Sequence, residues 1–519
     1  IETNTLTGSG IITANGGKGA TDNGCSGGGG GGGRIAIYYS TYNFSGTTSA
    51  FGGTGYQGGG AGTIYLKPSS QTYGDLIVDN NGLSGSITPL DNSSYNFGTT
   101  TFKNAAYLNI GSNTNFNSET VILQNNVRLV LLGTSTVFIG SSLNITSGTV
   151  TFDIPKNITT EPTFSNITVS SGATLTHSSH GSSHTYSLIL KSTGNFTVES
   201  GASINTNAKG YAGGYQDSGS GPGGGQGVNS SNTGCTGTSG AGGGYGGKGG
   251  NGTGNTTGGN SYGSLTQPTD LGSGGGGDYY SSGGAGGGAI KLIISGTLTV
   301  NGTISANGGD GNSGSTYDNG GGGSGGSIWI ETNTLTGSGI ITANGGNGAT
   351  ANGCSGGGGG GGRIAIYAAL NNFMGTISVY GGSGWQSGSQ GTLNTVMKKE
   401  VVSSEIENIL RLGNNRHTFY DGTNYWVFYV DVGGGGKVAF ETSSDGISWE
   451  GSVNEISSNS NCSSLGIWED STSVWVSYDC SLPNWIPNWN YRRPVTISNV
   501  GNSNNLVDFQ VKINVTYNS

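Results

Sequence analysis

The sequence predicts an all-β protein whose main body is a right-handed parallel β-helix, or solenoid, with glycine-rich insertions, followed by a small antiparallel β region. Three observations favour this fold. Glycine supplies 108 of the 519 residues, while charged residues make up only 9%. The intervals between glycines are filled by Thr, Ser, Asn, Val, Ile and Tyr, which suit pleated strands and tight turns. Finally, the sequence repeats itself at two periods, as stacked coils do.

The longer period is a near-identical duplication. Residues 1–17, IETNTLTGSGIITANGG, return unchanged at 330–346, an offset of 329 (330 minus 1), and CSGGGGGGGRIAIY occurs at both 25–38 and 354–367. So little divergence indicates recent duplication within a tandem array. Because Ser327-Ile328-Trp329 completes a strand ahead of the second copy, we expect that Ile1 is not the natural N-terminus.

The shorter period marks single coils. The strings GGAIKLII, GGSIWIET and GGRIAIYA place equivalent residues at Ala289, Ser327 and Arg363, with spacings of 38 (327 minus 289) and 36 (363 minus 327). Each unit has a strand, a turn, a second strand and a glycine-rich excursion, which together make one coil. Plainer coils, with apolar residues alternating toward a narrow core, are predicted before residue 210.

These patterns divide the chain into six segments. They are glycine-rich coils of the first copy (1–73), regular β-helix (74–210), a glycine-rich insertion (211–288), coils of the second copy (289–393), an Asp-box-like β region (394–484) and the start of a β-sandwich-like domain (485–519).

Composition excludes several classes of partner. The net charge of −9, with 19 Lys and Arg, offers no basic stripe for nucleic acid. No apolar run approaches the roughly 20 residues that span a bilayer. We therefore expect no nucleic-acid partner and no membrane span in this chain. The location that we expect is extracellular, at the cell surface.

Glycosylation and disulfide formation would both fit that location. Cys462 and Cys480 bracket a predicted hairpin and are candidates for a disulfide, while the partners of Cys25, Cys235 and Cys354 stay open. Twelve N-x-S/T sequons are candidate glycan sites, although a chain rich in Asn, Ser and Thr also produces them by chance. They lie at Asn43, Asn92, Asn144, Asn157, Asn166, Asn195, Asn229, Asn251, Asn255, Asn301, Asn461 and Asn514.

The two heptaglycine tracts, at residues 27–33 and 356–362, lack the Lys-Ser/Thr end of a phosphate-binding loop. We interpret them as loops folded along the solenoid or as extended polyglycine helices, with three residues per turn, packed side by side. Arg34 and Arg363 follow the tracts directly, and their guanidinium groups are expected to bond carbonyls of the folded tract.

Two groups of residues raise the question of a metal. His177, His180 and His184 lie close together, and imidazoles ligate zinc and copper, but the alternative is an exposed polar loop. Asp22, Asp310 and Asp318 lie in glycine-rich turns, where Asp is also a common turn residue, and the calcium-binding nonapeptide register is missing. We assign no metal or cofactor.

Two motifs near the C-terminal end resemble known families. Residues 443–449, SSDGISW, resemble the Asp-box of sialidase-like β-propellers, with altered spacing, which implies a structural turn. Residues 489–499, WNYRRPVTISN, resemble the start of a β-sandwich domain of unknown function in large archaeal and bacterial surface proteins. The whole chain resembles a large glycine-rich β-helix surface or adhesin-like protein.

The predicted function is a structural or adhesive one, in a fibre or filament subunit that associates with itself and contacts surface glycans. A polysaccharide-binding or polysaccharide-degrading β-helix is the alternative, and an ice-binding or carbohydrate-binding module is a third. With 28 Asp and Glu scattered over the chain and no recurring carboxylate pair, no catalytic residue is nominated.

Overall fold

The computed structural model describes residues 1–22, 24–91, 94–229, 238–314 and 317–397, and the backbone of six strands between residues 418 and 480. The chain divides into two units, Ile1–Thr395 and Val396–Ser519, and each is treated by itself. The described residues are all-β, as predicted; their helical content is one 3-10 turn, η1 (Thr253–Asn255).

The strands that begin in the first unit have between two and 19 residues, and most are separated by turns of a few residues. They are β1 (Glu2–Gly8), β2 (Ile11–Thr13), β3 (Thr21–Asp22), β4 (Cys25–Ser26), β5 (Arg34–Phe44), β6 (Thr47–Ser49), β7 (Thr63–Pro68), β8 (Asp75–Asp79), β9 (Thr88–Leu90), β10 (Ser94–Lys103), β11 (Tyr107–Ile110), β12 (Asn115–Gln124), β13 (Arg128–Leu131), β14 (Val137–Pro155), β15 (Thr163–Val169), β16 (Ala173–Thr176), β17 (Tyr186–Ser192), β18 (Phe196–Val198), β19 (Ser203–Asn205), β20 (Ala289–Val300), β21 (Thr303–Ser305), β22 (Ser327–Gly337), β23 (Ile340–Thr342), β24 (Thr350–Ala351), β25 (Cys354–Ser355), β26 (Arg363–Phe373), β27 (Thr376–Ser378) and β28 (Thr392–Met397).

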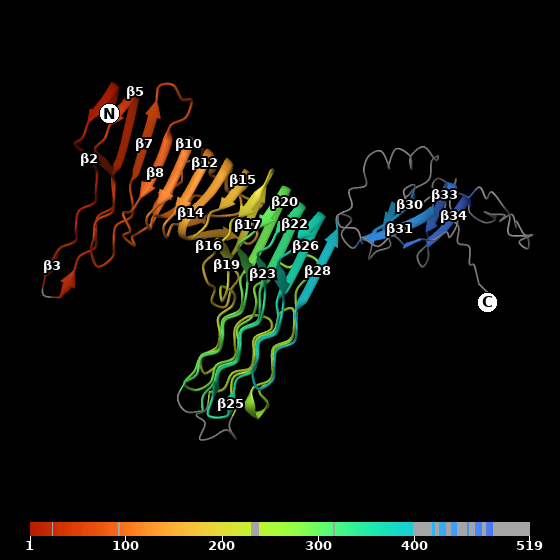
Figure 1. Cartoon of the computed structure of the whole chain (residues 1–519). Coiled ribbons are helices and arrows are strands. Elements are labelled where there is room, and N and C mark those ends of the chain that lie inside the picture. Colours follow the sequence, from red (N-terminus) through yellow and green to blue (C-terminus); the bar gives the residue numbers. More distant parts are fainter. Residues whose placement is uncertain are drawn as a thin grey trace, which may run out of the picture. The chain divides into compact units, whose positions relative to one another are not determined.

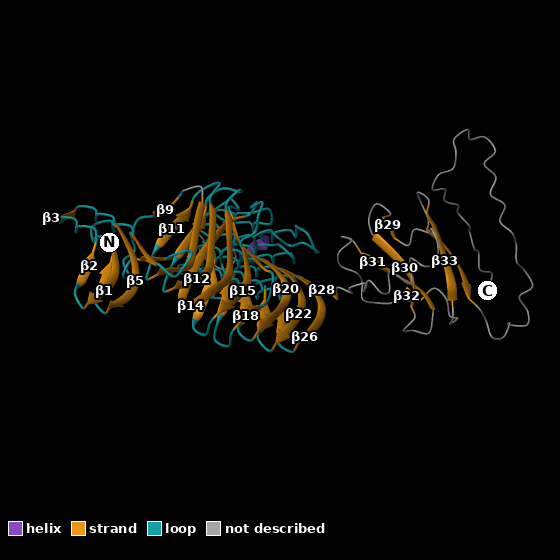
Figure 2. Cartoon of the chain, turned by 90° about the horizontal axis from the view of Figure 1, so that it is seen from above, coloured by secondary structure: helices purple, strands orange, loops and turns teal. Residues whose placement is uncertain are grey.

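Twenty-two of these strands form one sheet in which each strand pairs with its equivalent in the next coil (Figures 1 and 2). The pairing is parallel from β10 to β12 and β14, and again from β20 to β22 and β26. Two pairs are antiparallel, β7 with β8 and β14 with β17, so the sheet is mixed. Parallel stacking lets each coil satisfy the backbone groups of its neighbour along the stack.

Alternating apolar residues point inward and stack into columns. One column rises through consecutive coils by direct register pairing, and all its members are fully buried. It consists of Val78, Phe102, Leu123, Ile145, Val169, Val198 and Val300. Burying each such side chain contributes roughly 1.5–3 kcal/mol, so the column accounts for much of the stack's stability.

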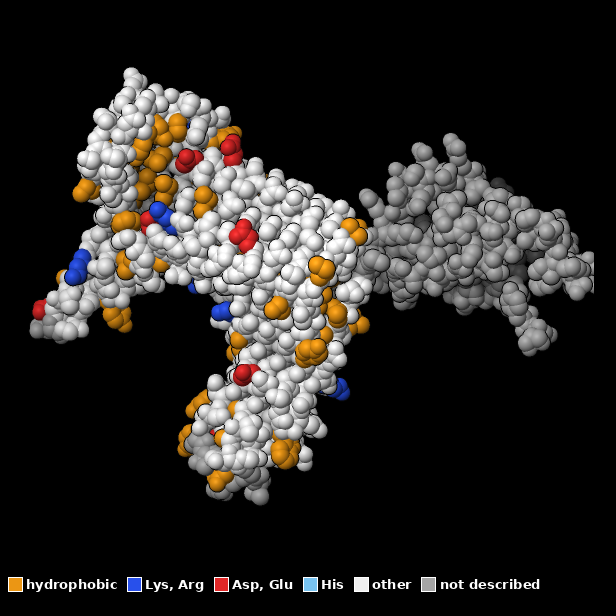
Figure 3. Space-filling view, viewed as in Figure 1, with side chains coloured by type: hydrophobic (Ala, Val, Ile, Leu, Met, Phe, Trp, Pro, Cys, Tyr) orange, Lys and Arg blue, Asp and Glu red, His pale blue; other side chains and the backbone are white. Residues whose placement is uncertain are grey.

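Glycine-rich segments project from one side of this stack. We call residues 210–227, 239–288, 306–314, 317–326, 343–362 and 379–391 the glycine-rich lobe. Residues 14–22, 24–33 and 50–62 form a smaller projection near the N-terminus (Figure 1). Charged side chains are sparse on the face of the first unit that Figure 3 shows. The lobe is built from backbone packed on backbone.

The second heptaglycine tract shows how the lobe is held together. Its amides donate hydrogen bonds to three neighbouring segments. Each segment accepts from every third residue of the tract, and three residues is the period of an extended polyglycine helix. The bonded pairs are Gly356–Ala349, Gly359–Gly346 and Gly362–Ala343 on one side, Gly358–Gln386 and Gly361–Ser389 on another, and Gly357–Gly240 and Gly360–Gly243 on the third.

The described part of the second unit consists of antiparallel strands. Strands β29 (Thr418–Tyr420), β30 (Tyr425–Asp431), β31 (Lys437–Ser443) and β32 (Asn454–Glu455) form one sheet, and β33 (Cys462–Glu469) pairs with β34 (Val474–Cys480). The Asp-box-like turn after Ser443 and the motif at 489–499 lie outside the described residues.

Candidate functional site at the base of the glycine-rich lobe

A cluster of titratable side chains lies in the segment that joins β16 to β17. The ring centroids of His177 and His180 are 5.3 Å apart, and those of His180 and His184 are 5.6 Å apart. His177 is 0% exposed and His180 is 9% exposed. The alternative of an exposed polar loop is therefore wrong for His177 and His180, because segments distant in sequence cover these two rings, whereas His184 is half-buried and residues 181–183 are exposed.

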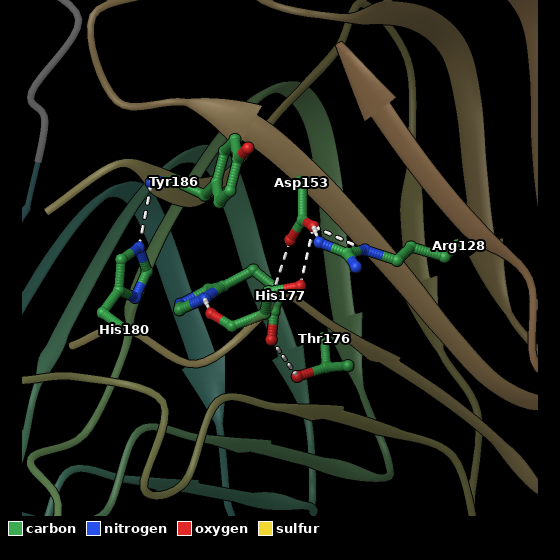
Figure 4. Close-up of polar contacts among 7 residues, drawn as sticks. Arg128, Asp153, Thr176, His177, His180 and Tyr186 are labelled. Carbon is green, nitrogen blue, oxygen red and sulfur yellow. Dashed lines mark hydrogen bonds and ion pairs between the residues drawn. The ribbon is translucent and has the colours of Figure 1, made fainter. Parts of the chain in front are cut away.

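Asp153, at the end of β14, fixes the start of the histidine segment (Figure 4). Its buried carboxylate accepts hydrogen bonds from the amide and hydroxyl of Ser178, both at 2.7 Å, and from the Nε and a terminal nitrogen of Arg128 at 3.1 and 3.0 Å. These four hydrogen bonds compensate fully for the free-energy cost of burying the carboxylate. Its role is to hold the loop in place.

His177 and His180 in turn hold the two ends of the glycine-rich insertion. His177 Nδ1 donates to Ser178 O at 2.8 Å, and its Nε2 accepts from the amide of Ala289 at 3.1 Å, where the chain returns to the stack. His180 Nδ1 donates to Lys209 O at 2.8 Å, where the chain leaves, and its Nε2 accepts from the Tyr186 amide at 3.0 Å. Both rings are therefore neutral Nδ1–H tautomers, assigned from their partners.

Burial keeps these histidines neutral. Desolvation lowers the pKa of His177 to about 4, an effect that the hydrogen bond to Ser178 O and the charge of Asp153 only partly oppose. Desolvation, with the positive charge of Lys156, lowers the pKa of His184 to about 3, and desolvation also lowers the pKa of His180. Protonation of Nε2 in His177 would place a donor against the Ala289 amide and break that bond.

Both ring nitrogens of His177 and of His180 are occupied by backbone groups, whereas His184 Nε2 bonds the hydroxyl of Ser187 at 2.9 Å. No set of three or more His, Cys, Asp or Glu among the described residues could hold a metal ion. Asp310 bonds the amide of Asn347 at 2.6 Å, and Asp318 is buried. We interpret the cluster as the anchor of the glycine-rich lobe.

Arg363 bonds a backbone carbonyl, but that carbonyl lies in a distant segment of the lobe, whereas the sequence predicts one in the heptaglycine tract. Its Nε and a terminal nitrogen donate to Tyr262 O at 2.9 and 2.7 Å, and its guanidinium lies 5.4 Å from the centroid of the Tyr245 ring. Burial raises the pKa of both tyrosines well above the ordinary value, so their hydroxyls stay protonated. Arg34, the counterpart in the first copy, is exposed.

The cysteines differ between the two copies. Cys354 is disulfide-bonded, whereas Cys25, at the equivalent position, is free and exposed. Cys235 lies outside the described residues. Cys462 and Cys480 are directly paired in the register of β33 and β34, so the disulfide predicted between them stays a prediction with compatible strand positions.

Peptide mapping without reduction should find Cys25 alkylated, Cys354 in a cross-linked peptide, and Cys462 linked to Cys480. With five cysteines in the chain, these results together would pair Cys354 with Cys235. The measurement is mass spectrometry of a digest prepared under iodoacetamide. Full alkylation of Cys354 would contradict the expectation.

The predicted glycan sites that the structure describes lie at the surface or close to it. Asn144 and Asn251 are half-buried, and the remaining ones are exposed. Asn195 also belongs to a ladder along the stack, since its Oδ1 accepts from Thr297 N at 2.9 Å and its amide donates to Asn166 Oδ1 at 3.0 Å. Exposed are Asn43, Asn157, Asn166, Asn195, Asn229, Asn255 and Asn301; outside the described residues are Asn92, Asn461 and Asn514.

Three pockets in the first unit contain few acidic groups. A pocket of about 90 Å³ holds Glu161, which pairs with Lys291 at 3.4 Å. A pocket of about 420 Å³ holds Glu2 beside Tyr38 and Tyr39, and one of about 450 Å³ has no carboxylate. None of the three therefore offers the pair of carboxylates that glycoside hydrolysis uses.

Comparison of the chain with protein-family models, curated proteins and solved structures finds no match. In the part of the chain that the structure describes, no helix has the length and apolar character needed to cross a bilayer.

Proposed function

We propose that this chain is a structural or adhesive protein of the cell exterior, a right-handed parallel β-helix that assembles into a fibre or filament. The observation that carries the proposal is the coil-to-coil register of the first unit, in which one apolar column continues from Val78 to Val300. In such an architecture the residues build a long, stiff stack of coils and not a cleft.

The mode of strand pairing supports assembly. Each coil adds to the next through parallel backbone pairing, as β20 pairs with β22 and β22 with β26. A strand from another chain can add to a stack of this kind through the same amides and carbonyls.

The bonding of the polar side chains supports a non-catalytic role. The buried histidines and Asp153 bond the backbone, and the three pockets described above lack paired carboxylates. We therefore propose that the protein is not an enzyme and that exposed Asn, Thr and Tyr side chains make its contacts.

Electron microscopy of the purified full chain over a range of concentrations tests this function. We expect filaments or end-to-end rods that lengthen as the concentration rises, because association through strand edges follows mass action. Single particles of constant size at every concentration would contradict assembly.

A further inference from the structure

Two turns of the glycine-rich lobe meet at the end of the lobe that is farthest from the stack. In one turn, Asp278 and Ser281 form an antiparallel bridge, in which each amide donates to the carbonyl of the other residue, at 2.9 and 3.2 Å. The other turn contains Asp318 and Asn319, and Asn319 Nδ2 donates to Cys354 O at 3.4 Å. Cys354 belongs to β25, which Figure 1 labels at the far end of the lobe.

Both turns bury a carboxylate. Asp278 is 0% exposed and Asp318 is 2% exposed. The Asp278 carboxylate accepts from the Tyr279 amide at 2.8 Å and from the Asn319 amide at 3.1 Å, so it lies against the peptide group that joins Asp318 to Asn319. Carboxylates buried in one place repel each other, and a cation bound between them would favour their charged forms.

Two neutral oxygen atoms in the same turns make no hydrogen bond. They are Ser281 Oγ and Asn319 Oδ1, which are buried in residues 2% and 0% exposed. The Asn319 amide is oriented by its Nδ2, which donates to Tyr317 O at 3.3 Å as well as to Cys354 O, so the unbonded atom is the oxygen. The Ser281 hydroxyl lies beside the Asp278 side chain, because paired residues of an antiparallel bridge point to one face.

We propose that Asp278, Ser281, Asp318 and Asn319 bind a calcium ion. Calcium takes about six to eight oxygen ligands, including carboxylates and amide carbonyls, and tolerates irregular geometry. The site has only two carboxylates, and neutral oxygens supply other ligands. It therefore differs from the clusters of three or more His, Cys, Asp or Glu that are absent from the described residues.

The ligands also indicate how tightly the ion binds and what it does. Because calcium affinity depends on the number of charged ligands, two carboxylates predict a dissociation constant on the order of 10⁻⁴ to 10⁻³ M. Magnesium suits the site less well, since it demands near-ideal octahedral geometry and gives up its water reluctantly. A bound ion would join two turns that are 41 positions apart in the chain and so stabilise the far end of the lobe.

This site goes beyond the proposed function, because all four ligands come from one chain and binding needs no assembly. Protection from amide exchange locates it. Calcium added to the full chain should slow exchange within residues 278–281 and 317–320, while the stack responds little. Protection confined to other segments would overturn the assignment, whether or not the chain forms filaments.

Calorimetric titration of calcium chloride into the full chain, after dialysis against a chelator, measures the affinity. We expect one site per chain and at least about tenfold weaker binding in Asp278→Asn, which removes one of the two charges. The matched control is Asp310→Asn in the same lobe. Asp310 is exposed and bonds the Asn347 amide, so this variant should bind calcium like the native chain. Absence of binding to the native chain, or equal binding by Asp278→Asn, would overturn the site.

The variant Ser281→Ala keeps the proposal testable if Asp278→Asn does not fold. Without calcium its melting temperature should equal or exceed that of the native chain, because the substitution removes a buried hydroxyl that makes no hydrogen bond. Adding calcium should then raise the melting temperature less in the variant than in the native chain. An equal rise in both chains, or a loss of stability in calcium-free buffer, would overturn the role of Ser281 as a ligand.

Discussion

Replacing Gly357 by alanine should destabilise the glycine-rich lobe by about 3 kcal/mol, the upper end of what overpacking costs in a close-packed interior. The new Cβ would lie 2.0 Å from Gly250 O and 2.7 Å from Gly250 C. Both atoms are backbone, so no flexible side chain is present to move aside. The change should appear as a lower melting temperature and as faster proteolysis within residues 239–262.

The control for this variant is contained in the same chain. Gly28→Ala changes the same residue in the same local sequence, but its Cβ has open space around it. We expect its stability to stay the same or to rise slightly, because alanine restricts the unfolded chain more than glycine does. Equal losses in the two variants would show that the glycines serve local conformation and not packing against neighbours.

Acidification from pH 7 to pH 4 should destabilise the junction between the stack and the lobe by about 3 kcal/mol through His177. Its pKa falls from 6.5 to about 4 on folding, and each unit corresponds to about 1.4 kcal/mol. Between these values the unfolded chain binds a proton that the folded chain does not, so stability falls as the pH falls. This contribution is fully present above pH 6.5.

The surroundings of His177 fix the sign of this effect. Desolvation opposes protonation of His177 most strongly, and the positive charge of Lys209, together with that of His180 whenever its ring is protonated, acts in the same direction. The charge of Asp153 favours protonation but is compensated by Arg128. His184 acts in the same direction as His177, with a smaller share because its side chain is partly exposed.

The variant His177→Gln isolates the contribution of this ring. The melting temperatures of the native chain and the variant are compared at pH 7 and pH 5, so that the titration of the carboxylates cancels in the difference. The native chain should lose more stability than the variant over this interval. An equal loss would contradict the assignment of the acid sensitivity to His177.

Much of the stack could be predicted because its signal is local and repeated. Alternation in strings such as AIKLII and SIWIET indicates inward-facing residues, and the 36- to 38-residue spacing indicates stacked coils. That Arg363 bonds backbone carbonyl groups was predictable, but its partner, Tyr262 O, lies 101 residues away and not in the adjoining glycine tract. The antiparallel pairs of β7 with β8 and β14 with β17 have no such periodic signal.

The histidine anchor could not be predicted, because its partners are distant in sequence. His177 bonds a residue 112 positions away, and its burial depends on where the chain returns from the insertion. It is harder still to predict that Cys25 is free while Cys354 is disulfide-bonded, since both cysteines lie in the same string of residues. Identical local sequence gives different environments here, so only the neighbouring coils distinguish the two copies.

The most direct test of this account is amide hydrogen exchange of the two heptaglycine tracts in the intact chain. Peptides over residues 20–33 and 349–362 can be told apart by mass, because Asp22 stands where the second copy has Ala351. If neighbouring backbone orders the tracts, the amides of Gly357 and Gly360 exchange far more slowly than those of Gly28 and Gly31. Equal exchange in the two tracts would contradict the claim that packed coils hold the lobe together.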